Sequence, residues 1–270
     1  MKFTNNTFVI TGGGNGIGRQ LVLNLLARGA RVAAVDIYQD GLDETAQMAG
    51  GDSSRLSRHI VDITDRDAVS VLPEDVIKAH GVVDGLINNA GVIHPFTGIQ
   101  EMDTGTIKRV MEINFFGTLH MTTSFLPYLR ERPEACIVNI SSMGGFLPVP
   151  GQGIYGASKS ATKLFTEALY AELLKTNIQV SVVFPGGVRT EIVDQLGIDS
   201  QALKSLAGIG AFFNPMSPEK AAMRIIKGVE KGCFQIYVGI DSIFMNVLYR
   251  LNSKLAIKLI TKQMGPLLDV

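Results

Sequence analysis

The sequence predicts a single α/β domain in which short buried strands alternate with amphipathic helices. Its 270 residues suit one large domain of this class with a substantial core. Short apolar runs, such as residues 8–10 and 31–35, are followed by segments in which apolar residues recur every three or four positions. The first of these strand-to-helix transitions passes through a glycine-rich turn at residues 11–18. We expect the domain to cover residues 1–240 and to contain the catalytic site, with residues 241–270 as a basic amphipathic helix and tail of the same domain.

Composition narrows the partners and the location. The 25 basic and 25 acidic residues give a formal net charge of zero, so nothing favours a nucleic acid partner. Cys136 and Cys233 are isolated thiols without a CxxC pair, which fits a reducing compartment and indicates no metal site. Residues 1–13 leave no room for a signal peptide, and no apolar stretch is long enough to cross a bilayer. We therefore expect a cytoplasmic protein.

The glycine-rich turn predicts a dinucleotide site. A strand at residues 8–10 runs into the turn, and a helical pattern follows it as far as Gly29. Glycines let the backbone approach a pyrophosphate closely, and the free N–H groups and dipole at a helix start attract its negative charge. The spacing differs from GxGxxG, because three residues follow the first glycine and one follows the second. The residues expected to contact the cofactor here are Gly12, Asn15, Gly16, Ile17 and Gly18.

An acidic residue ends the second predicted strand. Asp36 follows residues 31–35, where a dinucleotide fold places a carboxylate against the ribose hydroxyls of adenosine. A 2′-phosphate would be repelled there. No Lys or Arg occupies residues 13–15, and Ile37 and Tyr38 follow the acid, so we expect no cation for such a phosphate and favour NAD over NADP. The alternative is a solvated aspartate that caps the strand.

A third strand, residues 56–61, leads to Asp62 and Ile63. The Asp62 carboxylate is expected either to reach the adenine amino group or to cap the helix that starts near Asp65. A fourth strand, residues 83–87, ends in Asn88, Asn89, Ala90 and Gly91. These amides and small residues are expected to form a polar floor for a ribose and a nicotinamide, although the same composition also makes a good turn.

The predicted strand at residues 179–184 runs into a Pro-Gly turn. Carboxyl ends of strands are where open α/β sheets hold cofactors, so this backbone is expected to bond the nicotinamide carboxamide. Thr190 is expected to cap a helix or to touch the carboxamide and phosphates. Residues 191–215 show weak periodicity, which suits either a mobile loop over the site or an ordinary surface excursion. The contact residues expected in the turn are Pro185, Gly186, Val188 and Thr190.

Tyr155 and Lys159 are the expected centre of the chemistry. They lie four positions apart in a predicted helix over residues 153–176 and therefore share one face. A fixed ammonium is expected to lower the pKa of the phenol toward neutrality, so that Tyr155 can exchange a proton with a substrate oxygen. Ser142, after the strand at residues 136–140, is expected to donate to the same oxygen. Taken alone, a Tyr and Lys at this spacing are a common surface pair.

Two further predicted helices carry unusual residues. Asn114 interrupts the apolar positions of a long helix over residues 104–129, which Pro127 should bend or end. This amide either holds a water that feeds protons toward Lys159 or is satisfied by neighbouring backbone. The tail, residues 242–264, predicts one helix with an apolar stripe and a basic row that recurs every fourth residue. We expect the stripe to pack on the domain or a partner subunit, with a membrane-surface role as the alternative. The stripe comprises Phe244, Val247, Leu248, Leu251 and Leu255, and the row comprises Arg250, Lys254, Lys258 and Lys262.

Together these motifs resemble the classical group of the short-chain dehydrogenase/reductase superfamily from about residue 6 to residue 240. The shared features, in family order and spacing, are TGxxxGxG at 11–18, NNAG at 88–91, Asn114, Ser142, YxxxK at 155–159 and the turn at Pro185. The resemblance implies a doubly wound Rossmann-type domain with a seven-stranded parallel sheet. It also implies a tetrad in which Ser142 positions the substrate oxygen, Tyr155 is the acid/base, Lys159 bonds the nicotinamide ribose and Asn114 holds a relay water.

The resemblance further implies a homodimer or homotetramer whose interface includes the helices of Asn114 and Tyr155. The tail is similar to basic extensions of relatives that act on steroids, retinoids or lipids. Asp36 argues against the NADP-dependent 3-oxoacyl carrier-protein reductases of the family, and the Tyr-to-Lys spacing differs from that of enoyl reductases.

The resulting expectation is an NAD(H)-dependent oxidoreductase that interconverts a secondary alcohol and a ketone on a hydrophobic substrate. The alternatives are a reductase of a small ketone and a dinucleotide sensor without turnover. His94 is expected either at the edge of the substrate pocket or simply exposed. The expected pocket residues are Ser142, Met143, Gly144, Phe146, Val149, Gln152, Gly187 and Ile192.

Overall fold

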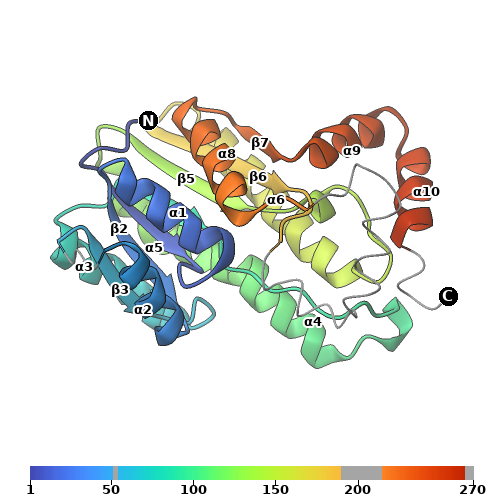
Figure 1. The fold of residues 1–270 in the computed structure, drawn as a ribbon, viewed down its shortest axis with the longest axis horizontal. Helices are drawn as coiled ribbons and strands as arrows, with labels where there is room; N and C mark the ends of the chain where they lie inside the picture. The colour runs from blue at the N-terminus through green and yellow to red at the C-terminus, as the bar shows by residue number, and fades with distance from the viewer. Residues whose placement is uncertain (51–53, 190–214, 265–270) are drawn as a thin grey trace.

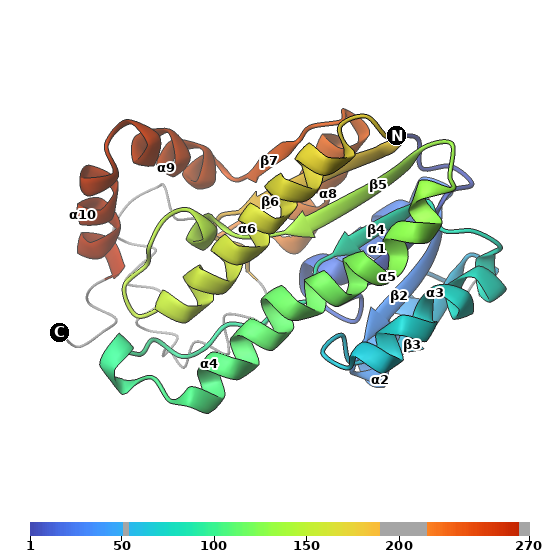
Figure 2. The ribbon, with the colours of Figure 1, turned by 180° about the vertical axis from the view of Figure 1, so that it is seen from behind.

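The structure is a computed structural model that describes residues 1–50, 54–189 and 215–264. It shows one α/β domain with a seven-stranded parallel sheet between two layers of helices (Figures 1 and 2). All the predicted strands form. They are β1 (Thr7–Thr11), β2 (Arg31–Asp36), β3 (Leu56–Ile60), β4 (Gly85–Asn88), β5 (Ala135–Ile140), β6 (Ile178–Pro185) and β7 (Gln235–Val238). The described α-helices are α1 (Gly16–Ala27), α2 (Gln39–Met48), α3 (Arg66–His80), α4 (Thr104–Met111), α5 (Thr118–Arg130), α6 (Gly153–Leu173), α8 (Pro218–Glu230), α9 (Ile240–Leu251) and α10 (Ser253–Met264).

The strand order creates a place for a ligand. The order is β3-β2-β1-β4-β5-β6-β7, so the winding direction reverses between β1 and β4, which are hydrogen-bonded neighbours. In open parallel sheets the crevice beyond the carboxyl ends at such a reversal is where ligands bind. The glycine turn after β1 and the NNAG segment after β4 therefore meet at one edge of the sheet.

Two apolar layers hold the sheet from both sides. On one face α1, α2 and α8 pack through a cluster that includes Leu21, Leu42 and Ile225. On the other face α3, α5 and α6 pack through a cluster that includes Leu72 and Phe125. Both faces of the sheet are covered, which explains why the strands are nearly continuous apolar runs rather than alternating ones.

A polar network crosses the interior beneath the cleft. Asn88 donates to Asn139 Oδ1 at 2.8 Å and to Thr122 Oγ1 at 3.1 Å, and Asn139 donates to Thr166 Oγ1 at 2.9 Å. These four buried residues join β4, β5, α5 and α6. Because an unpaired buried amide is costly, the network fixes α6 against the strands that carry the site.

The long helix predicted over residues 104–129 is interrupted. A π turn over Glu112–Gly117 separates α4 from α5, and Asn114 lies within it. The carbonyl of Asn114 accepts from Thr118 Oγ1 at 3.1 Å and from Thr162 Oγ1 at 3.0 Å, which replaces the regular helical pattern there. Pro127 does not end the helix, because α5 continues to Arg130. Pro127 lies on the exposed side, where water can bond the carbonyl that its missing N–H leaves free.

The tail forms two helices rather than the predicted one. Asn252 is extended between α9 and α10, and its side chain accepts from the backbone N–H of Leu255 at 3.0 Å, which caps α10. The inward residues differ from the predicted stripe. Met245, Ala256 and Ile260 are buried against the cluster of Met143 and Leu147, whereas most of the predicted stripe is exposed. The expectation that the stripe packs on the domain is therefore wrong for Val247, Leu251 and Leu255.

None of the helices in the described ranges has the length and apolar character needed to pass through a bilayer.

Candidate functional site

A cleft of about 970 Å³ lies at the carboxyl edge of the sheet, at the winding reversal. It is lined by the first glycine turn, the end of β2, the residues after β3 and β4, and the starts of α6 and of the turn after β6. Most of the predicted site residues meet here. Those that line the cleft are Gly12, Asn15, Gly16, Ile17, Asp36, Ile37, Asp62, Ile63, Asn89, Ala90, Gly91, Ser142, Tyr155, Lys159, Pro185, Gly186 and Val188. Thr190, Ile192 and the predicted loop at 191–214 lie outside the described residues.

The glycine turn is built by close backbone approach. Gly12 has φ +67° and Gly16 has φ +50°, conformations that favour glycine. Gly18 does not line the cleft as expected. It lies beneath the turn, where a Cβ would stand 1.9 Å from the Gly12 carbonyl oxygen. The role of Gly18 is therefore to let α1 start directly under the turn, so that the helix N-terminus faces the cleft.

The turn is also tied to the neighbouring strand. Thr11 Oγ1 accepts from the backbone N–H groups of Asn89 and Ala90 at 3.0 Å each, and Asn89 Nδ2 donates to the Thr11 carbonyl at 3.0 Å. Asn88 faces the buried network instead, so the polar floor consists of Asn89, Ala90 and Gly91 only. The reason is the alternation of side chains along β4, which turns Asn88 away from the cleft.

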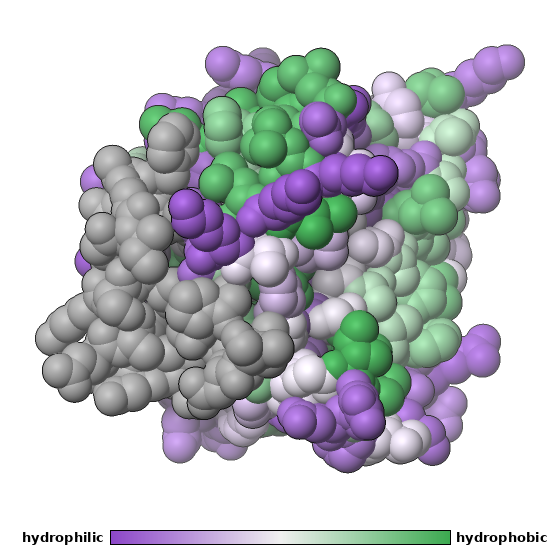
Figure 3. Space-filling view, turned by 90° about the vertical axis from the view of Figure 1, so that its right-hand side faces the viewer, coloured by the Kyte–Doolittle hydropathy of each residue, from purple (hydrophilic) through white to green (hydrophobic). Residues whose placement is uncertain are grey.

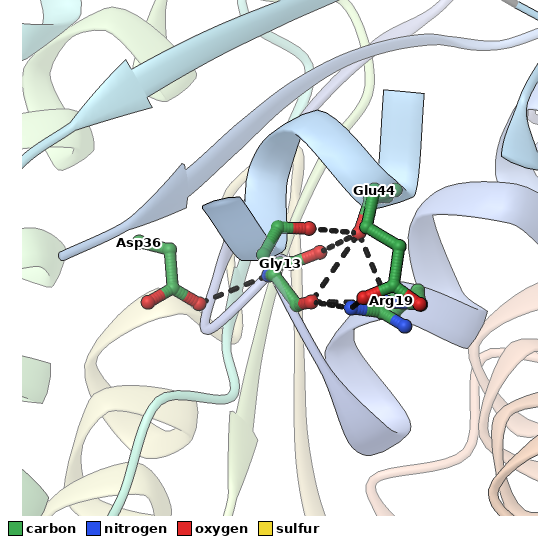
Figure 4. A network of polar contacts seen from close by, with 7 residues as sticks. Gly13, Arg19, Asp36 and Glu44 are labelled. Carbon is green, nitrogen blue, oxygen red and sulfur yellow. Dashed lines mark hydrogen bonds and ion pairs between the residues drawn. The ribbon is translucent and has the colours of Figure 1, made fainter. Parts of the chain in front are cut away.

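At the β2 end of the cleft, Asp36 is held by backbone. Its Oδ2 accepts from Gly14 N–H at 2.9 Å and its Oδ1 from Tyr38 N–H at 3.2 Å. A cation outside the segments considered in the sequence, Arg19, also lines the cleft. Arg19 donates to the Gly14 carbonyl through Nε at 3.0 Å and pairs with Glu44 at 2.7 Å (Figure 4). Arg19 lies outside residues 13–15 and 37–38, but α1 brings the Arg19 side chain back over the turn.

Asp62 lines the cleft beside this end, but it does not cap α3. Its Oδ1 accepts from Thr64, from the backbone N–H at 2.9 Å and from Oγ1 at 2.8 Å. The residue that caps α3 is Asp65, which accepts from Asp67 N–H and Ala68 N–H. The capping alternative for Asp62 is therefore wrong, and its carboxylate remains on the wall of the cleft.

The predicted catalytic residues converge at the opposite end. The Ser142 and Tyr155 side chains share a hydrogen bond, and Ser142 Oγ also accepts from Gly144 N–H at 3.1 Å. Lys159 is buried and donates from Nζ to the Ile140 carbonyl at 3.0 Å. Ser141 Oγ donates in turn to the Lys159 carbonyl at 2.8 Å. These reciprocal bonds fix α6 on the end of β5 and aim Tyr155 and Lys159 into the cleft.

Burial governs the protonation of both groups. It raises the pKa of Tyr155, and the hydrogen bond with Ser142 opposes this only in part. Burial also lowers the pKa of Lys159 to about 8. The direction for Tyr155 is opposite to the lowering expected from the Lys159 ammonium. The reason is that removal of water from the phenolate outweighs the stabilisation that neighbouring groups give it.

Asn114 is fully buried and satisfied. Its Oδ1 accepts from Val92 N–H at 2.8 Å, and its Nδ2 donates to the Val92 carbonyl and to Ser158 Oγ at 2.9 Å each. The alternative of an amide satisfied by neighbouring backbone therefore describes this side chain. Asn114 nevertheless adjoins Lys159, since a Cβ on Gly91 would lie 3.0 Å from both Asn114 Oδ1 and Lys159 Nζ.

His94 supports the start of α6 instead of being exposed. It is buried, its Nε2 accepts from Tyr155 N–H at 3.4 Å, and its Nδ1 bonds the Pro95 carbonyl at 2.7 Å. The neutral tautomer with the proton on Nδ1 makes both bonds. Gln152, expected in the substrate pocket, donates to the His94 carbonyl at 2.8 Å and is likewise buried.

Most of the expected substrate residues do not face the cofactor cleft. Beyond Ser142 the chain folds back through a short 3-10 turn (Met143–Gly145), which buries Met143 in the core and turns the following residues toward α9. A second pocket of about 590 Å³ forms there and includes Tyr249 of α9. The expected residues that line it are Gly144, Phe146, Val149 and Gln152.

Asp241, which the sequence analysis missed, joins α9 to the Pro-Gly turn. It is buried in the first turn of α9, and its Oδ2 accepts from Gly187 N–H at 2.8 Å. A Cβ on Gly186 would lie 2.1 Å from the same carboxylate oxygen. Gly187, expected against the substrate, thus serves as a backbone contact to the tail. The sequence feature that could have identified Asp241 is an acidic residue shortly after the last strand, at the start of a mainly apolar helix.

The comparison with known proteins agrees with this geometry. Residues 6–201 match the family described as short chain dehydrogenase. The chain belongs to this family of oxidoreductases. This match confirms the resemblance seen in the sequence. Short-chain dehydrogenases bind a nicotinamide dinucleotide and act on small molecules.

Individual relatives cover between 73% and 94% of the chain. It is 34% identical over 257 residues to "Putative oxidoreductase SadH" of Mycobacterium tuberculosis (strain H37Rv), covering 93% of this chain and 92% of that protein. It is 32% identical over 196 residues to the 3-oxoacyl-[acyl-carrier-protein] reductase FabG of Thermotoga maritima, covering 73% and 79%. The crystal structure of a short-chain dehydrogenase/reductase from Burkholderia phymatum in complex with NAD shares the fold, with a TM-score of 0.84, 24% identity and coverage of 94% and 96%.

The cleft of this short-chain dehydrogenase fits a dinucleotide. Its volume lies at the upper end of the range for small-molecule sites. Side chains are absent where a ligand must approach the backbone, since a Cβ on Gly12 would lie 2.9 Å from Asn89 Nδ2. The glycine turn would hold the pyrophosphate, Asp36 the adenosine ribose, and Tyr155 and Lys159 the nicotinamide end.

The close packing of the glycine turn predicts the effect of adding one methyl group at Gly18. Gly18→Ala should weaken NADH binding by about 5- to 150-fold, because its Cβ would force the Gly12 carbonyl away and overpacking of this kind costs about 1–3 kcal/mol. The measurement is a fluorescence titration with NADH, accompanied by thermal unfolding. Gly98→Ala is the matched control, since the nearest atom to its Cβ would be 3.7 Å away. Unchanged NADH affinity in Gly18→Ala would show that this turn does not hold the cofactor.

Proposed function

We propose that this chain is an NAD(H)-dependent oxidoreductase that interconverts a secondary alcohol and a ketone. The observation that carries the proposal is the convergence of Ser142, Tyr155 and the buried Lys159 on the wall of one cleft. A hydroxyl donor beside a phenol suits a substrate oxygen that gains or loses a proton. The name of the Thermotoga relative, which describes the reduction of a 3-oxo group, supports the same class of reaction.

Each residue of the site has a distinct part in this proposal. A bound nicotinamide supplies or accepts the hydride. Ser142 bonds the substrate oxygen, and Tyr155 donates its proton to a ketone or removes one from an alcohol. The raised pKa keeps Tyr155 protonated at neutral pH, which favours donation to a ketone. Lys159 supplies positive charge beside the phenolate when it forms, and Asn114 holds the Val92 backbone and α6 in register around it.

We propose a hydrophobic substrate, of steroid-, retinoid- or lipid-like character. The lining of the cleft includes the apolar residues Val92, Ile113 and Val188, which supports this class over a sugar. The expected pocket residues beyond Ser142 give no such support, because they face the second pocket.

We also propose a homodimer or homotetramer that works in the cytoplasm. Leu164 of α6 is 66% exposed and Phe116 of the π turn 37%, on the helices that the resemblance places in a subunit interface. Cys136 and Cys233 are free thiols, which supports a reducing compartment.

Removal of the phenol hydroxyl separates binding from chemistry. Tyr155→Phe should lower kcat by about 10²–10⁴-fold, the usual contribution of a general acid/base, and leave the Kd for NADH within about twofold. Turnover is followed at the nicotinamide absorbance after a screen of secondary alcohols and ketones identifies a substrate. Tyr170→Phe, on the same helix and stacked on Phe234, is the control and should retain activity. Full turnover by Tyr155→Phe would refute the mechanism.

The raised pKa of Tyr155 predicts opposite pH profiles for the two directions. Alcohol oxidation needs the phenolate, so its kcat should increase as pH rises from 6 to 9. Ketone reduction needs the phenol, so its kcat should stay level through neutral pH and fall only in alkali. Ser142→Ala removes the hydrogen bond that lowers this pKa, and should move the oxidation limb to higher pH in steady-state assays. Reduction that accelerates with pH would contradict this assignment.

The adenosine end predicts the choice of cofactor. We propose a preference for NAD(H), because a 2′-phosphate would meet Asp36 while the nearby Arg19 is already paired with Glu44. Asp36→Asn keeps an acceptor for Gly14 N–H but removes the charge, so it should tighten NADPH binding at least tenfold relative to NADH. Calorimetric or fluorescence titration gives both Kd values. Asp43→Ala removes one charge from α2, outside the cleft, and should change neither. A wild-type protein that prefers NADPH would overturn the argument.

A further inference from the structure

One side of α9 presents an exposed apolar ridge, which we define as Ile240, Ile243, Val247 and Leu251, continued by Leu255 of α10. The α9 positions recur at intervals of three or four residues and therefore share one helix face. Leu251 is 81% exposed and Ile240 71%. Figure 3 views this end of the molecule and shows apolar side chains gathered in its upper part, beside a row of hydrophilic ones. Such a concentration of exposed apolar residues marks an interaction surface.

The ridge cannot turn inward, because the opposite side of α9 is already anchored. Asp241 accepts from Gly187 N–H, Ser242 Oγ donates to the Phe184 carbonyl at 2.8 Å, and Met245 is buried in the core. These contacts fix the rotation of the helix. The ridge is thus apolar surface in addition to the face that packs on the domain.

Within α9 and α10, the exposed charges are of one sign. Arg250, Lys254, Lys258 and Lys262 are all exposed. The only acid between residues 240 and 264 is Asp241, which is buried and hydrogen-bonded. Because the whole chain is neutral, this end is a local excess of positive charge on a protein that is otherwise slightly acidic. Apolar residues flanked by cations without exposed carboxylates complement an anionic lipid surface.

We propose that the ridge and this basic row dock the protein on anionic phospholipid membranes, with α9 lying in the interface plane. A membrane explains both features, since the ridge enters the boundary of the acyl chains while the cations meet the headgroups. A second copy of the chain explains only the ridge. A two-fold contact through this face would bring two basic rows together, and juxtaposed like charges oppose association. The proposal does not depend on which alcohol or ketone the cleft accepts.

The test is co-sedimentation of the full-length protein with sucrose-loaded vesicles. Vesicles of phosphatidylcholine with 30% phosphatidylserine should bind at least tenfold more protein than vesicles of phosphatidylcholine alone, and binding should fall as salt is raised. The double variants Val247→Asp/Leu251→Asp and Lys254→Glu/Lys258→Glu should each reduce binding at least tenfold. These side chains are exposed, so circular dichroism and NADH affinity should match those of the wild type.

Two matched controls isolate the surface. Val71→Asp places a charge on an exposed apolar residue of α3, and Lys175→Glu reverses an exposed cation beyond α6; both should bind vesicles like the wild type. Absence of vesicle binding by the wild type, or equal binding by the ridge variant, would overturn the proposal. A third result would also overturn it: the wild type does not bind vesicles, and light scattering shows that the ridge variant has a different oligomeric state. That result would assign the ridge to a subunit contact.

Discussion

The site depends on the attachment of α6 to the end of β5. Lys159 donates to the Ile140 carbonyl while Ser141 donates to the Lys159 carbonyl, so helix and strand hold each other at the point where the strand ends. This pairing places Tyr155 against Ser142, which follows β5 directly. The buried Asn88–Asn139–Thr166 network supports the same joint from below. A shift of α6 along the sheet would break all of these contacts together, and cooperative contacts of this kind keep catalytic groups in place.

Burial gives the two ends of the cleft different electrostatic characters. At the β2 end, Asp36 accepts hydrogen bonds from backbone N–H groups and Glu44 pairs with Arg19. At the end beside β5, burial raises the pKa of Tyr155 and lowers the pKa of Lys159, so the neutral form of each group is favoured. The polar groups at the first end are thus fixed by hydrogen bonds, whereas those at the second are set up for proton exchange.

Local patterns made the fold and much of the site predictable. The glycine spacing, the acid at the end of β2, and Tyr155 and Lys159 are each defined by short intervals, so the sequence contains their geometry directly. The residues that were missed act across long intervals: Arg19 reaches Glu44, and Asp241 reaches Gly187. No local pattern shows such pairs.

Other differences have equally specific causes. The sign of the Tyr155 pKa shift depends on burial, which spacing does not show. The tail has apolar residues on more than one side, so periodicity could not show which side packs, nor that Asn252 divides it. The expected substrate residues were displaced because the chain reverses after Ser142.

The bond from Asp241 to Gly187 ties the tail to the turn whose neighbouring residues, Gly186 and Val188, line the cleft. A chain shortened at residue 240 would lose the carboxylate that holds the Pro-Gly turn, and with it the backbone that lines the nicotinamide end. Shortened forms made for crystallisation, and tags fused close to α9, therefore risk altering the kinetics of an enzyme whose catalytic residues are untouched.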